Sequence, residues 1–172
     1  KYIGRTGGCG DAEGMSGDCL SFYVTTDMPW QGTTVYDCTN EKPVHGTLAI
    51  RIPEWSRSFK VSGVTGELDE STAQLKDGYL YVERDWKKGD SVKLELSMET
   101  EFIAANTEVR EDMNKTALRR GPFIYCLEEA DNGSGLHTLN VCVDSKPEEL
   151  MLNIAGTDVV ALRIAGKRRK AS

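Results

Sequence analysis

The chain has 172 residues, enough for one globular domain, or for one β-sandwich plus part of another, with a core that needs no metal or disulfide support. Its net charge of −6 argues against a broad nucleic-acid surface, which would be basic, and no apolar run approaches the length of a membrane span. We therefore expect neither nucleic acid nor a membrane among its partners.

Residues 1–20 are rich in glycine and poor in apolar side chains. Because glycine adds backbone freedom without packing, this stretch predicts a connector rather than the start of a domain. The domain proper is expected over residues 21–172, with a subdivision near residues 105–115 and a truncated end.

Beyond the connector, apolar and polar residues alternate. Val92, Leu94, Leu96 and Met98 alternate with polar residues, which predicts a strand with one dry and one wet face. Further strands are expected at residues 21–26, 33–38, 48–52, 58–62, 79–84, 123–127, 139–143, 150–154 and 159–164. Glycine- and asparagine-containing turns separate these runs, and the nearest helix candidate, residues 99–111, is weak. The pattern predicts an all-β fold, an antiparallel β-sandwich of the jelly-roll kind.

The five cysteines form no Cys-x-x-Cys unit. Cys9 and Cys19 are the one candidate for a local disulfide, on condition that the compartment is oxidising. Cys126 and Cys142 lie in apolar stretches, where we expect them to be small buried hydrophobic residues.

No metal site or other cofactor is predicted, because a Cys/His zinc site needs four ligands at suitable spacing. His45 and His137 each lie beside a glycine and are expected to be exposed loop residues. The acidic pairs of the sequence are equally unsuited to catalysis. Glu128 and Glu129 are neighbours on an extended chain and point to opposite faces, and Asp85 and Asp90 flank a turn.

The three tryptophans, Trp30, Trp55 and Trp86, each lie at a predicted strand edge or turn. There a tryptophan can bury a large apolar area and donate its indole N–H to a loop carbonyl, which is the structural interpretation. Alternatively, the rings stack on the C–H faces of a sugar, or contact a second domain or a dimer partner. A carbohydrate-binding module would present at least two exposed, coplanar rings on one face.

Three stretches together resemble a known family. They are DMPWQG at residues 27–32, LAIRIPEW at residues 48–55 with GYL at residues 78–80 and RDWKKGDSV at residues 84–92, and KTALRRGPFIYCLE at residues 115–128. In this order and at this spacing they resemble the C-terminal β-region of the family-127 glycoside hydrolases, the β-L-arabinofuranosidase-like proteins. The resemblance covers residues 26–132 and extends more faintly to residue 164.

The resemblance implies an (α/α)₆ catalytic barrel before this region, with a cysteine nucleophile in a Cys-Cys-Pro-Pro-type motif, a zinc site and an acid/base glutamate. The present chain contains no such motif, so we assign it no catalytic residue. The aromatic-rich strand usual near the end of the family is also missing, and the glycine-rich opening fits the family pattern poorly.

The resemblance therefore predicts a non-catalytic module of a bacterial enzyme of carbohydrate metabolism, which braces the absent helical barrel or builds a homodimer contact. The parent enzyme would hydrolyse L-arabinofuranosides, and a cytoplasmic location is favoured over a periplasmic or secreted one. The alternatives are a stand-alone carbohydrate-binding module that uses exposed tryptophans, and a hydrolase in its own right.

Two arginines in the last of the three stretches are candidates for docking. Arg119 and Arg120 precede the Gly121-Pro122 turn, and arginine can clamp a carboxylate bidentately. We expect both to pin the module to the barrel.

Overall fold

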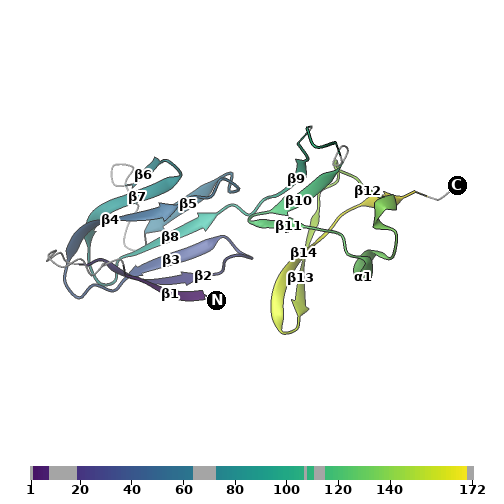
Figure 1. The fold of residues 1–172 in the computed structure, drawn as a ribbon. Coiled ribbons are helices and arrows are strands. Elements are labelled where there is room, and N and C mark those ends of the chain that lie inside the picture. The colour runs from purple at the N-terminus through teal and green to yellow at the C-terminus, as the bar shows by residue number, and fades with distance from the viewer. Residues whose placement is uncertain (1, 8–18, 64–72, 107, 111–114, 170–172) are drawn as a thin grey trace. The chain divides into compact units, whose positions relative to one another are not determined.

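The computed structural model describes residues 2–7, 19–63, 73–106, 108–110 and 115–169. It confirms the all-β fold, and the chain divides into two compact units, Lys1–Met98 and Glu99–Ser172 (Figure 1). The subdivision expected near residues 105–115 thus lies earlier, at residue 98.

The first unit contains two antiparallel sheets. The five-stranded sheet has the order β1-β2-β3-β8-β5 and is formed by β1 (Tyr2–Gly7), β2 (Ser21–Thr26), β3 (Thr33–Cys38), β8 (Ser91–Leu96) and β5 (Phe59–Gly63). The three-stranded sheet has the order β4-β7-β6 and is formed by β4 (Val44–Arg51), β7 (Tyr79–Trp86) and β6 (Ala73–Lys76).

The core of the first unit lies between these sheets, so the predicted β-sandwich is confirmed there. The five-stranded sheet contributes Phe22, Cys38, Val92 and Leu94, and the three-stranded sheet contributes Ile50, Leu80, Val82 and Trp86. The rings of Phe22 and Trp86 meet edge to face, with centroids 5.0 Å apart. On one face of β7, Leu80, Val82 and Trp86 are buried and Arg84 is half-buried, whereas the residues between them are exposed, as expected of a half-buried strand.

One close backbone contact locks the end of β8 beside the start of β3. The Leu96 N–H donates to the Gly32 carbonyl at 2.9 Å, and a Cβ atom on Gly32 would overlap the Leu96 carbonyl oxygen. Glycine is required here for close approach of two backbones.

The second unit is built from smaller sheets. One has the order β11-β10-β9, with β11 (Phe123–Tyr125), β10 (Thr116–Arg120) and β9 (Thr100–Ala104). The other two are pairs: β12 (Leu139–Val141) with β15 (Gly166–Arg168), and β13 (Glu148–Ile154) with β14 (Thr157–Arg163). A one-turn helix α1 (Glu129–Asn132) and a 3₁₀ turn (Leu136–Thr138) precede β12.

The second unit buries few apolar side chains. Among the described residues from 99 onward, Val160 alone belongs to the fully buried apolar set, whereas the first unit contributes nine members. The second unit also carries the larger share of the exposed large apolar side chains: Val109, Ile124, Leu127, Val143, Met151, Leu152 and Ile154.

Three expectations need correction. Residues 2–7, expected in a connector, form β1, which pairs with β2 along its whole length through the backbone and so needs no apolar pattern. The weak helix candidate at residues 99–111 contains strand β9, because β10 pairs with it. Cys126 is exposed and Cys142 half-buried, since both lie just beyond short strands. The Cys9–Cys19 pair involves residue 9, which lies outside the described residues.

Candidate functional site

Trp86, at the end of β7, is fully buried and serves as a structural anchor. Its indole N–H donates to the Gly46 carbonyl at 2.9 Å, and the Arg84 guanidinium lies 5.4 Å from its ring centroid. With Phe22 packed on it as well, the ring offers no face to a sugar. The structural interpretation of this tryptophan is therefore the correct one.

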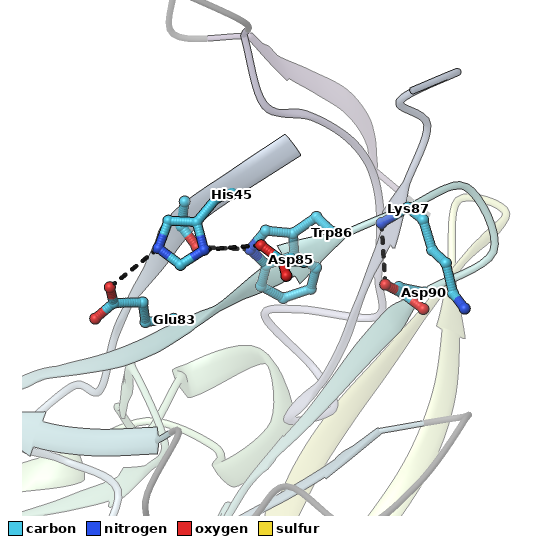
Figure 2. A network of polar contacts seen from close by, with 7 residues as sticks. His45, Glu83, Asp85, Trp86, Lys87 and Asp90 are labelled. Carbon is cyan, nitrogen blue, oxygen red and sulfur yellow. Dashed lines mark hydrogen bonds and ion pairs between the residues drawn. The ribbon is translucent and has the colours of Figure 1, made fainter. Parts of the chain in front are cut away.

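Asp90 lies in the turn after β7 and stabilises the end of that strand. Its carboxylate is buried and accepts the Lys87 N–H at 3.0 Å, with the Arg84 guanidinium 3.6 Å away (Figure 2). Its backbone carbonyl accepts the Cys38 N–H at 2.8 Å, which ties the turn to β3. Asp90 is thus a structural carboxylate that closes the 86–90 turn.

Trp30 and Trp55 are half-buried, at loop positions flanking the sheets. Sugar contact through these two rings is untested and stays a prediction.

His45 lies on the outer face of the three-stranded sheet, between two carboxylates. Its Nδ1 is 2.9 Å from Asp85 Oδ1 and its Nε2 is 3.3 Å from Glu83 Oε1 (Figure 2). Hydrogen bonding to Asp85, and then to Glu83, raises the pKa of His45 above 6.5. His45 was expected in a loop, but it is a strand residue of β4, opposite Asp85 of β7. It is exposed, as expected.

This His45 cluster is unsuited to hold a metal, because each ring nitrogen points at a different carboxylate and both are used in hydrogen bonds. More widely, no group of three or more His, Cys, Asp or Glu side chains is placed to hold a metal ion in the described part of the chain. Nor does any helix there have the length and apolar character needed to cross a membrane.

The acidic residues of the two pairs lie in different structural settings. Asp85 is exposed on the outer face of β7, whereas Asp90 is buried in the turn that follows. Glu129 accepts the Gly135 N–H in the second unit, and Glu128 is the residue that precedes α1. Asp85 and Asp90 thus differ in burial, and Glu129 is engaged in a local hydrogen bond.

The two docking candidates, Arg119 and Arg120, are neighbours on β10 and point to opposite faces. Arg119 pairs with Glu101 of β9. Arg120 is buried and holds Glu149 of β13 bidentately, with Nε–Oε1 at 2.8 Å and Nη2–Oε2 at 3.0 Å. Both ion pairs lie within the second unit, and the role of these arginines in docking to a barrel stays a prediction.

The sequence analysis missed one pair of aromatic residues. Tyr79 and Tyr81 both point outward from β7, are 37% and 36% exposed, and have ring centroids 6.3 Å apart with planes tilted by 42°. The alternation of Tyr79 and Tyr81 with inward Leu80 and Val82 was the available signal, because residues two apart share a strand face.

Comparison with known protein families shows to which family the two units belong. Residues 11–98 match the middle domain of glycoside hydrolase family 127, described as β-L-arabinofuranosidase, and residues 100–162 match the C-terminal domain of the same family. The chain belongs to glycoside hydrolase family 127. The border between the two family-127 domains coincides with the division between the two compact units.

Individual family-127 proteins agree with this assignment. A non-reducing end β-L-arabinofuranosidase from Bifidobacterium longum subsp. longum is 34% identical over 130 residues, which are 73% of this chain and 19% of that protein. A GH127 β-L-arabinofuranosidase from Geobacillus stearothermophilus T6 superposes with a TM-score of 0.79 at 36% identity, covering 87% of this chain and 24% of that one.

A further structure, described as a glycoside hydrolase, superposes on all of this chain with a TM-score of 0.83 at 25% identity, which is 28% of that chain. The chain therefore spans about a fifth to somewhat over a quarter of the length of these relatives.

Proposed function

We propose that this chain is the non-catalytic β-region of a glycoside hydrolase that acts on β-L-arabinofuranosides, and that the region braces the catalytic barrel or forms a dimer contact. The names of the similar proteins support the substrate class. The structural role of the buried Asp90, in contrast to the exposed Asp85, supports a region without a reaction centre of its own.

The observation that carries the bracing role is the apolar surface of the second unit. Ile124 is 60% exposed, Met151 64% and Ile154 58%, while the unit buries little apolar area of its own. Large apolar side chains left in water in such number favour a contact with a partner. A partner that covers these side chains would supply the burial that the unit lacks.

The activity test compares this 172-residue chain with the longest reading frame that contains it. Only the longer protein is expected to hydrolyse p-nitrophenyl β-L-arabinofuranoside. Turnover by the 172-residue chain would contradict the non-catalytic assignment, and inactivity of the longer protein on arabinofuranosides would contradict the substrate class.

The bracing test uses the double variant Ile124→Ser/Met151→Ser, with Leu75→Ser as the matched control, because Leu75 is 57% exposed on β6 of the first unit. In the longer protein, the double variant should lower the melting temperature and the control should not. In the 172-residue chain, the double variant should reduce self-association in light scattering without lowering the melting temperature. An unchanged melting temperature of the longer double variant would rule out this contact.

A further inference from the structure

The outer face of the three-stranded sheet carries an ordered set of side chains around Tyr79 and Tyr81. The register places Arg51 and Lys76 on either side of Tyr79, and Ala49 and Gln74 on either side of Tyr81. Directly opposed residues on antiparallel strands have Cβ atoms about 5 Å apart, so the two rings and their neighbours form one continuous surface. All four flanking residues are exposed.

Three side chains of this surface carry hydrogen-bonding groups that no other described residue uses. Within the described residues, the side chains of Arg51, Gln74 and Lys76 are engaged in no hydrogen bond or ion pair. Ala49 is small and leaves space beside the Tyr81 ring. Two aromatic rings flanked by unengaged donors match the two needs of a sugar, a C–H face to cover and hydroxyl groups to bind.

The charges of the face favour a neutral ligand. Arg51 and Lys76 lie at the Tyr79 end, and Glu83 and Asp85 lie further along β7 beyond Tyr81. Positive and negative charges therefore balance along the strand. A nucleic acid or an acidic peptide would meet the two carboxylates, whereas a neutral polar ligand would not be repelled at either end.

We propose that Tyr79 and Tyr81, with Arg51, Gln74 and Lys76, form a binding surface for a neutral oligosaccharide, separate from any catalytic centre. The tilt of 42° between the rings fits a soluble chain whose successive sugars turn relative to each other, and it does not fit a flat crystalline polymer. The proposal rests on the proposed function only for the choice of the first sugar to be tested.

The test is an NMR titration of the ¹⁵N-labelled 172-residue chain with an L-arabinofuranose disaccharide, xylotriose and trigalacturonate as separate probes. At least one neutral probe should shift amide signals of β4, β6 and β7, with a Kd of about 1 mM. Shifts with trigalacturonate alone, or with no probe, would overturn the proposal. Shifts that depend on protein concentration without sugar would show instead that the face binds a second copy of the chain.

The variants Tyr79→Ala and Tyr81→Ala should each weaken binding by about tenfold, the change expected when roughly 1.4 kcal/mol of contact is lost. Tyr23→Ala is the control, since Tyr23 is 42% exposed on β2 of the other sheet and should leave the Kd unchanged. Tyr81→Phe keeps the ring and should bind within about twofold of the natural chain. Unaltered binding by Tyr81→Ala would overturn the proposal.

These outcomes are separable from those of the proposed function. A longer protein active on arabinofuranosides, whose 172-residue region binds none of the neutral probes, would remove the binding surface and leave the proposed function intact. Binding of xylotriose at the tyrosines, with no arabinofuranosidase activity in the longer protein, would support the binding surface and contradict the proposed function.

Discussion

At the scale of single residues, Trp86 combines two kinds of stabilisation at one position. Its ring fills the space between the sheets, and its indole N–H satisfies the Gly46 carbonyl. A buried carbonyl that loses its donor costs free energy in addition to any lost packing.

The variant Trp86→Phe removes one of these contributions in full and the other in part. It keeps an aromatic ring but removes the donor and part of the volume, and it should lower the free energy of unfolding of the first unit by about 1–3 kcal/mol. Trp86→Ala should lower it by about 3–5 kcal/mol. Urea unfolding followed by the fluorescence of Trp30 and Trp55, which belong to the same unit, provides the measurement. Equal stabilities of Trp86→Phe and the natural chain would contradict a stabilising role of the indole hydrogen bond and of the lost ring volume.

His45 gives a pH-dependent prediction on the surface of the same unit. Hydrogen bonds to Asp85 and Glu83 raise the pKa of His45 above 6.5 in the folded chain. The stabilisation from this cluster is therefore fully present below pH 6.5 and is lost as the pH rises through the raised pKa.

Asp85→Asn removes the largest cause of this increase, so the pKa of His45 should fall towards its ordinary value in an NMR titration of the imidazole ring. Glu41→Gln, which removes a carboxylate paired with Lys88, is the control and should leave the His45 pKa unchanged. A His45 pKa that is the same in Asp85→Asn as in the natural chain would contradict the hydrogen-bonded arrangement.

At the scale of elements, the second unit depends on the ion pair between β10 and β13. Arg120 is 4% exposed, so its charge has little contact with water, and Glu149 accepts two of its hydrogen bonds. Removing a carboxylate that pairs with a buried charge is destabilising, whereas removing one from an exposed pair costs little.

The adjacent glutamates of β13 provide a matched pair of variants. Glu149→Gln should lower the free energy of unfolding of the second unit by about 2–4 kcal/mol. Glu148→Gln disrupts only the exposed contact with Arg163 and should change it by less than about 0.5 kcal/mol. The amide signals of β10 and β13 during thermal unfolding report both values, and equal effects of the two variants would contradict the assigned role of Arg120.

The strands that sequence could predict are those whose side chains alternate. Residues 21–26 and 33–38 were predicted with the observed ends, because their inner and outer faces differ. Strands β1, β6, β10 and β15 were missed. Three of them lie at the edge of a sheet and need backbone pairing on one side only, whereas β10 is the central strand of its sheet, and only five residues long. Residues 100–104 lack a strong pattern of their own, and pairing with β10 decides their conformation.

The surface positions were harder to predict. The local sequence around His45 contains no carboxylate, and Glu83 and Asp85 reach it only through the register of β4 with β7. The same register brings Arg51 and Lys76 to Tyr79 from two other strands. Contacts between residues distant in sequence depend on strand pairing, which alternation alone does not define.

At the scale of the whole molecule, the two units differ in how well they are buried. Nearly all fully buried apolar side chains among the described residues belong to the first unit. Amides of β3, β7 and β8 should therefore exchange with solvent more slowly than those of β13 and β14, by about a hundredfold, which corresponds to roughly 2.7 kcal/mol of opening free energy. Hydrogen exchange of the 172-residue chain measures this, and equal protection in the two units would contradict it.

The contact between Gly32 and Leu96 sets a different kind of limit on the first unit. A large core residue such as Trp86 can be exchanged for a smaller one, and the protein then tolerates a partial void. Gly32 can only be enlarged, and the place of the first added atom is already taken by main chain, which has no alternative rotamer to adopt. In a saturation mutagenesis of residues 1–98, Gly32 should therefore permit fewer replacements than Trp86.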